Sequence, residues 1–217
     1  MKRWTRHAPG EALARHRHDA GYVAGVLVGG YLEAGEGGRV RAEAGMALVH
    51  HGWAAHRDGF GSLGARVLNL PLPAGLAEGP VRLADLDAVA RLAERDPHAA
   101  AELVRDTATA IGATPGDWPD LLAAALGRDP ALSITGWADD AGLDPASVSR
   151  GFARAYGVSP KRFRLELRTR SAVRALSGWR GTLAALAADH GFADQAHFAR
   201  AALALTGFTP SQLKSAR

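Results

Sequence analysis

Cysteine is absent from the 217 residues of the chain, which excludes disulfide bonds, zinc sites built on thiolates and catalysis by a cysteine nucleophile. This absence fits a reducing compartment. No apolar run approaches the roughly 18 residues that a membrane-spanning helix needs, so no membrane span is expected. The N-terminal residues 1–10 are charged and no apolar stretch follows them, so we expect no signal peptide and a cytoplasmic protein.

Net charge is modest, but it is unevenly distributed along the chain. Residues 131–217 hold 12 Lys and Arg against 6 Asp and Glu, a net charge of +6, whereas residues 1–130 carry a net charge of −2. A basic C-terminal part is typical of a domain that binds a polyanion. By charge alone, a solvated domain rich in arginine is an equally good interpretation.

Residues 1–75 are rich in glycine and in β-branched or aromatic residues, which predicts short strands. The expected strands are 22–28, 38–43, 46–50 and 65–70. We expect them to form a small antiparallel barrel or sandwich, which ends at Pro71 and Pro73 because proline lacks a backbone donor.

Residues 81–128 have apolar side chains three or four positions apart, which predicts helices. A second helix is expected after Asp96 and Pro97, a typical N-cap followed by proline at the first helical position. Its expected buried face comprises Ala100, Leu103, Val104, Thr107 and Ile111. A third helix is expected to open at 117–119. These helices can cover the barrel, form a dimerisation surface, or do both. We assign residues 1–128 to one domain, with the barrel at 1–75 and the helices at 81–128.

A 50-residue repeat marks the C-terminal part, residues 131–217, which we expect to be a separate all-helical domain. Segment 144–160 matches segment 194–210 at Asp144/Asp194, Ala146/Ala196, Arg150/Arg200, Gly157/Gly207, Ser159/Thr209 and Pro160/Pro210. In each copy a helix ends at a glycine, an apolar residue follows, and an aspartate can cap a second helix. This order is the layout of a helix-turn-helix, so two such units are predicted.

The second helix of each unit is predicted to have two faces. The expected buried stripes are Val148, Phe152 and Ala155 in the first unit, and Phe198, Ala202 and Leu205 in the second. The opposite faces carry small residues around one arginine, Arg150 or Arg200, which suits insertion into the major groove and a bidentate contact with guanine. A plain helical hairpin with a solvated arginine is the alternative for one unit, and the repetition favours DNA reading.

One basic helix is expected between the units, over residues 160–177, with Glu166 as its single acid. Such a helix can hold the two recognition helices at a fixed separation. Four of its side chains are candidates for phosphate contacts: Lys161, Arg162, Arg164 and Arg168. Phosphate contacts add affinity without sequence information. For any one of these residues, a merely solvated charge is the alternative.

The C-terminal part resembles the DNA-binding domain of the AraC/XylS family of transcription regulators, best over residues 187–200 and 206–210. By position, the resemblance implies base reading by Ala146, Ser149 and Arg150 in the first unit and by Gln195, Ala196, Ala199 and Arg200 in the second. It also implies that both recognition helices enter successive major-groove segments, about 34 Å apart. The family usually has an aromatic residue where Ala202 lies. We expect that neighbours such as Leu203 and Leu205 make up the packing, or that the second unit is less stable.

The N-terminal part is similar to the cupin-like sensor domains that many of these regulators carry. His16 and His18 resemble the first cupin motif, and residues 44–56, which end at His56, resemble the second. The glutamate that would follow His18 is absent. The resemblance implies an effector pocket lined by His16, His18, His56 and Trp53, with His50 and His51 nearby. The imidazoles of His16, His18 and His56 can hold a divalent metal ion, bind an organic effector without a metal, or serve packing alone.

The expected fold class is therefore α+β, a cupin-like β-barrel with helices followed by an all-α domain with two helix-turn-helix units. The leading hypothesis is a sequence-specific transcription regulator that is not an enzyme. Its expected partners are double-stranded DNA, a small-molecule effector, a second copy in a homodimer, and RNA polymerase. The alternatives are a metal-dependent cupin enzyme with a helical appendage, which needs an open metal coordination position, and a DNA-binding protein whose barrel only dimerises. The missing glutamate and the repeat favour the regulator.

Overall fold

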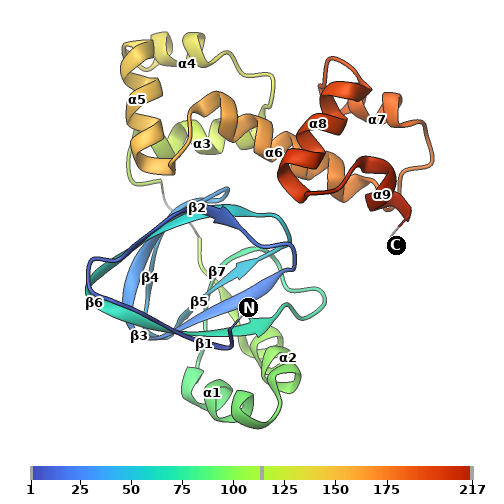
Figure 1. Ribbon diagram of the computed structural model, residues 1–217. Helices are drawn as coiled ribbons and strands as arrows, with labels where there is room; N and C mark the ends of the chain where they lie inside the picture. Colours follow the sequence, from blue (N-terminus) through green and yellow to red (C-terminus); the bar gives the residue numbers. More distant parts are fainter. Residues whose placement is uncertain (1, 113–114, 216–217) are drawn as a thin grey trace. The chain divides into compact units, whose positions relative to one another are not determined.

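The computed structural model describes residues 2–112 and 115–215. The chain divides into two compact units, residues 1–116 and residues 117–217, which we call the barrel domain and the helical domain (Figure 1). The expected α+β class, an antiparallel β-domain followed by an all-helical one, is confirmed. In the part of the chain that is described, no helix is both long and apolar enough to cross a membrane.

The barrel domain is built on one antiparallel sheet, which has eight strands within the described residues. These strands are β1 (Trp4–His7), β2 (Ala12–Arg17), β3 (Tyr22–Gly35), β4 (Gly38–Glu43), β5 (Met46–His50), β6 (Ala55–Pro71), β7 (Gly79–Arg82) and β8 (Thr109–Ala110). β3 and β6 are much longer than the predicted runs 22–28 and 65–70. Each changes partner along its length: β3 pairs with β5 and then β4, and β6 pairs with β2 and then β1. The sheet thereby curls around an interior (Figure 1).

The two long strands bend where glycines let their backbones approach. Gly29 and Gly64 both have positive φ, and a Cβ on Gly29 would collide with the Gly64 carbonyl oxygen. The pairing of β3 with β6 shifts register between Val26 and Val28 and again between Gly29 and Tyr31. Such bulges change which side chains of a strand point inward.

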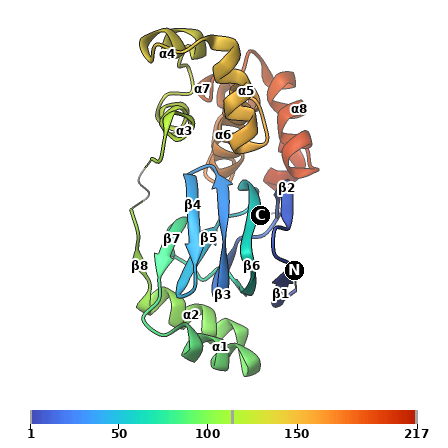
Figure 2. The same ribbon diagram turned by 90° about the vertical axis from the view of Figure 1, so that its left-hand side faces the viewer.

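Helices α1 (Leu86–Arg95) and α2 (Pro97–Thr107) pack against the outside of the sheet, and Figure 2 shows both on the same side of it. The contact buries apolar residues of strands and helices alike, among them Val23, Leu68, Leu70, Val89 and Val104. Asp96 caps α2 by accepting hydrogen bonds from the backbone N–H groups of His98 and Ala99, both 2.9 Å, as its position before Pro97 predicts. The helix ends at Thr107, which is exposed, so the expected places of Thr107 and Ile111 on its buried face are wrong.

The helical domain contains α3 (Trp118–Arg128), α4 (Ile134–Asp140), α5 (Pro145–Tyr156), α6 (Pro160–Ala175), α7 (Leu183–Asp189), α8 (Gln195–Thr206) and α9 (Pro210–Ser215). The boundary at residues 116 and 117 lies earlier than the expected one at 128–131, because α3 packs with the helices that follow it. The Tyr156 hydroxyl donates a 2.6 Å hydrogen bond to Asp120 of α3, and Trp118 fills the space above Gly151.

Candidate functional site

The two predicted helix-turn-helix units, α4–α5 and α7–α8, have matching turns. Gly142 and Gly191 end the first helices with φ of 66° and 71°, in the left-handed region that glycine adopts at little cost. In each turn the N–H of the next residue, Leu143 or Phe192, donates to a carbonyl five residues back, at 2.9 Å and 2.8 Å. Both turns therefore close by the same hydrogen bonds.

The recognition helices α5 and α8 also begin and end alike. Asp144 accepts a 2.8 Å hydrogen bond from the Ser147 N–H, and Asp194 accepts a 2.6 Å bond from the His197 N–H. The hydrogen bond from Ser147 lowers the pKa of the exposed Asp144 carboxyl. Gly157 and Gly207 end the helices with φ of 77° and 80°. Local capping thus fixes the length and direction of both helices.

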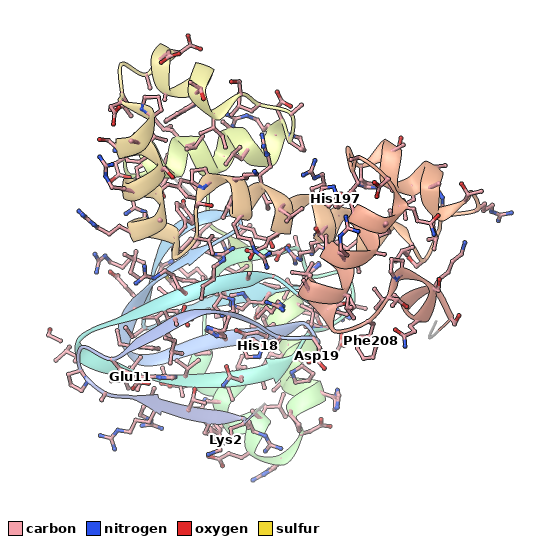
Figure 3. All side chains as sticks on the ribbon, turned by 45° about the horizontal axis from the view of Figure 1, so that its top comes forward. Lys2, Glu11, His18, Asp19, His197 and Phe208 are labelled. Carbon is pink, nitrogen blue, oxygen red and sulfur yellow. The ribbon has the colours of Figure 1, made fainter. Side chains whose placement is uncertain are left out.

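The predicted base-reading side chains lie on the outer faces of these helices. All are exposed except Ala199, which is half-buried: Ala146, Ser149, Arg150, Gln195, Ala196 and Arg200. The Arg150 Nη2 donates a 3.1 Å hydrogen bond to the Ser147 hydroxyl one turn earlier, which restrains the guanidinium. Figure 3 labels His197 on α8, and its ring is nearly perpendicular to that of Phe192, with ring centroids 5.2 Å apart.

The cores of the two units differ. In the first, the rings of Phe152, Tyr156 and Phe163 are fully buried, with centroids 4.5 to 5.2 Å apart. In the second, Ala202 is fully buried and Leu205 is buried as expected. The expectation that Leu203 also fills the gap is wrong, because its side chain is 49% exposed.

Two of the four predicted phosphate-binding side chains of the central helix α6 instead form hydrogen bonds within the helical domain. Arg164 Nη1 donates a 2.9 Å hydrogen bond to the Leu132 carbonyl, just before α4 begins. Arg168 Nη1 donates a 2.5 Å bond to the Gly191 carbonyl and its guanidinium lies 4.9 Å from the Phe192 ring centroid. Burial and the nearby Arg164 lower the pKa of Arg168. One arginine therefore fixes each unit to α6, a role that the sequence did not indicate.

The other two predicted phosphate-binding residues remain at the surface. Lys161 is exposed at the start of α6. Arg162 is exposed as well, and its Nε donates a 2.9 Å hydrogen bond to the buried Glu166 carboxylate one turn later. Both side chains are therefore accessible from solvent.

Residues 137–216 match the family described as "Helix-turn-helix domain". These residues form a helix-turn-helix domain. The matched segment begins within α4 and extends past α9, so it includes nearly all of both units and the whole of α6. No curated protein matches the chain.

Several solved structures are similar to the chain. The C-terminal domain of AraT, a response regulator from Geobacillus stearothermophilus, is 19% identical at a TM-score of 0.42, with 46% of this chain and 84% of that chain covered. ToxT from Vibrio cholerae is 8% identical at a TM-score of 0.46, with 99% of this chain and 98% of that chain covered. KdgF from Halomonas sp. is 19% identical at a TM-score of 0.29, with 30% and 61% covered. The identification of the helix-turn-helix domain rests on the sequence match.

The interior of the barrel domain holds a cavity of about 150 Å³. Its walls carry four histidines, two carboxylates and two tyrosines: His7, His16, His18, His56, Glu33, Asp58, Tyr22 and Tyr31. His18 lies among the strands in Figure 3. The predicted trio of His16, His18 and His56 is brought together, since one nitrogen of each lies within 4.8 Å of the others.

Two carboxylates that the sequence did not single out face this cavity. Glu33 of β3 and Asp58 of β6 are directly opposite each other in the sheet and both are buried. Burial and the charge of Asp58 raise the pKa of Glu33 well above its usual range, and burial raises the pKa of Asp58 to about 7. The cavity therefore disfavours negative charge unless a cation enters it.

The imidazole of His56 contacts those of three other histidines, His16, His18 and His50. Burial, His50 and two other neighbouring imidazoles lower the pKa of His56 to about 2, so its ring is neutral. The Tyr22 hydroxyl lies 3.2 Å from His56 Nε2 and restrains the ring. Burial also raises the pKa of Tyr22, so its hydroxyl keeps its proton.

Trp53 was expected to line the pocket, and this expectation is wrong, because Trp53 is not among the residues that line the described cavity. Its φ is 59°, and its backbone N–H donates a 2.7 Å hydrogen bond to the His18 carbonyl. Trp53 thus positions the segment that carries His18. His51 does not line the cavity either, and its Nε2 forms a 2.9 Å hydrogen bond with the Leu76 carbonyl.

Proposed function

We propose that the protein is a sequence-specific transcription regulator, in which α5 and α8 read double-stranded DNA and the barrel cavity binds a small effector. One observation carries the DNA-reading part. Arg150 and Arg200 occupy equivalent exposed positions on two helices that are capped and ended alike. Such repetition is expected if both helices perform the same task in successive stretches of the major groove.

The chemistry of recognition follows from the side chains on the two outer faces. An arginine can donate two hydrogen bonds to guanine O6 and N7, and such a pair discriminates against other bases by about 1–3 kcal/mol. Small neighbours such as Ala146 and Ala196 let the helix backbone approach the groove. Lys161 and Arg162 add contacts to phosphates, while Arg164 and Arg168 hold the two units on α6.

The effector is limited in size by the cavity. A volume of about 150 Å³ is below the roughly 300–1,000 Å³ of pockets for drug-sized ligands, so the effector is an ion or a small polar compound. Two alternative groups of side chains, which share His56, could contact it: His16, His18 and His56, or Glu33, His50 and His56. Regulation requires that the effector bind one state of the protein more tightly than another, with DNA affinity changing reciprocally. The proposal includes a homodimer and contact with RNA polymerase.

Selection of bound sequences from a random pool of double-stranded DNA tests the base-reading proposal. Arg150→Ala and Arg200→Ala should each weaken binding to the selected site about 5- to 150-fold and relax the preference at different positions of the site. Arg180→Ala, which removes an exposed arginine between the two units, is the matched control and should leave the preference unchanged. Unchanged preferences in both recognition-helix variants would contradict the proposal.

A metal-dependent cupin enzyme remains the second candidate because imidazoles and carboxylates share the cavity. It requires a bound metal with an open coordination position and turnover of a small substrate. If the wild-type protein shows no sequence-specific DNA binding and turns over a small substrate only with a metal ion, the enzyme is favoured.

A further inference from the structure

We propose that the barrel domain binds one divalent transition-metal ion through Glu33, His50 and His56, and that this ion is the effector. The metal-binding part stands on the geometry of the barrel alone. The effector part rests on the proposed function, since it assigns a ligand class to the regulator's cavity.

The three side chains already converge. One ligand atom of each lies within 4.8 Å of the other two, and all three residues are buried. The His50 Nε2 and Glu33 Oε2 atoms are 3.4 Å apart. Metal–ligand distances of about 2.0–2.2 Å in a tetrahedral site place neighbouring ligand atoms about 3.3 Å apart. The His50–Glu33 pair has this spacing, and a ring nitrogen of His56 lies within 4.8 Å of a ligand atom of each.

The three ligands come from paired strands and not from loops. Glu33 lies on β3, His50 on β5 and His56 on β6, and β3 is hydrogen-bonded to both of the others. The Tyr22 hydroxyl, 3.2 Å from His56 Nε2, restrains the His56 ring in the way that outer partners of metal ligands do. A site held by strands has little conformational entropy to lose when an ion binds.

A second observation indicates that a cation belongs here. Asp58 is 5% exposed, and its Oδ1 has no hydrogen-bond partner among the described residues. It stands directly opposite Glu33 in the sheet. Buried polar atoms are normally paired, and two facing buried carboxylates are costly without a compensating positive charge. A divalent ion held by Glu33 would supply that charge beside Asp58.

The donor atoms decide the class of ion. Two imidazoles with one carboxylate suit zinc, nickel, cobalt or iron, whereas magnesium and calcium prefer oxygen ligands alone. The histidine trio of His16, His18 and His56 is a competing site that shares His56. Its ligands are all imidazoles, and His16 and His18 are only half-buried, so an ion bound there would have no contact with Glu33. This difference favours the Glu33 site.

Calorimetric titration of the chelator-treated full chain with zinc chloride or nickel chloride tests the site, with magnesium chloride as a control. We expect one ion per chain and at least 100-fold weaker binding in Glu33→Gln and in His50→Gln. The matched variant His18→Gln, which removes a ligand of the competing site, should bind within threefold of the wild type. Binding that survives in Glu33→Gln and is lost in His18→Gln would overturn the proposal, as would the absence of binding in the wild type.

X-ray absorption of the zinc-loaded wild type gives an answer that does not depend on how the variants fold. A ligand shell with two imidazoles supports the site, and one with three imidazoles overturns it. DNA affinity for the selected sequence, measured with and without zinc, should change at least fivefold, and no change would overturn the effector role. Loss of specific DNA binding with metal binding intact contradicts the proposed function alone, whereas specific DNA binding without metal binding contradicts this inference alone.

Discussion

Phe152 in the first helix-turn-helix unit and Ala202 in the second occupy equivalent positions, 50 residues apart, and both are fully buried. Two further equivalent positions also have an aromatic residue in the first unit and a non-aromatic one in the second: Tyr156 corresponds to Thr206, and Phe163 corresponds to Leu213. The backbone hydrogen bonds, caps and left-handed glycines are shared by the two units. The comparison teaches that short-range capping, and not the core, sets the path of the chain through each unit.

The two cores also draw on different neighbours. The first unit is completed by α3, through the hydrogen bond from Tyr156 to Asp120. At the equivalent place in the second unit, the Thr206 hydroxyl donates to the Ala202 carbonyl at 2.8 Å, which is a bond within its own helix. The first unit is therefore tied to a helix outside the repeat, and we expect it to be the more stable of the two.

The largest effect should come from the aromatic core of the first unit. Phe152→Ala removes a fully buried ring and should lower the free energy of unfolding of the helical domain by about 3–5 kcal/mol, because a cavity remains. Urea denaturation followed by helix ellipticity measures it. Leu203→Ala, at an exposed position of the second unit, is the control and should change stability by less than about 0.5 kcal/mol. A loss below about 1 kcal/mol for Phe152→Ala would contradict the view that the aromatic core makes the first unit the more stable one.

Tyr156→Phe should have the next largest effect, a loss of about 1–3 kcal/mol, since the buried Asp120 carboxylate loses a 2.6 Å hydrogen bond while the ring stays in place. The same denaturation experiment applies. Thr206→Val, which removes the equivalent but half-buried hydroxyl, should cost less. Equal losses in the two variants would show that the hydrogen bond to α3 stabilises the first unit no more than the bond within α8 stabilises the second.

Smaller and equal effects are expected at the shared glycines. Gly157→Ala and Gly207→Ala both place a Cβ on a left-handed residue, so each should cost about 1–2 kcal/mol. Gly178→Ala, at a site with open space and no positive φ, serves as the control. Because the two backbones match, costs that differ by more than about 1 kcal/mol would contradict the view that capping is equivalent in both units.

The smallest effects should separate the residues of α6 by role. Lys161→Ala should reduce the slope of log affinity against log salt by about 0.9, the loss of one phosphate contact, with little change in stability. Arg168→Ala should leave that slope unchanged and cost about 1 kcal/mol of stability, because it releases the Gly191 carbonyl and the Phe192 ring. Binding isotherms at several salt concentrations measure the slope. A reduced slope for Arg168→Ala would assign that residue to DNA.

The sequence by itself determined the two helix-turn-helix units and their outer faces. Aspartate caps, glycine ends and the Ser-Pro and Thr-Pro starts act within a few residues, so their effect can be deduced from spacing. Helical periodicity then placed Arg150 and Arg200 outside and Phe152 and Leu205 inside. The expected α+β class followed from the change of pattern between residues 1–75 and the helices behind them.

Only the tertiary structure decided the contents of the barrel cavity and the roles of the basic residues on α6. Two register shifts in β3 reverse its alternation, so Tyr22, Ala24 and Val26 face inward, as do Tyr31 and Glu33 further along. Strict alternation from Tyr22 would have placed Glu33 outside. Arg164 and Arg168 look like surface charges until the carbonyls they bind are brought to them by folding. Long-range pairing creates these sites, and no local pattern encodes which distant group a side chain will meet.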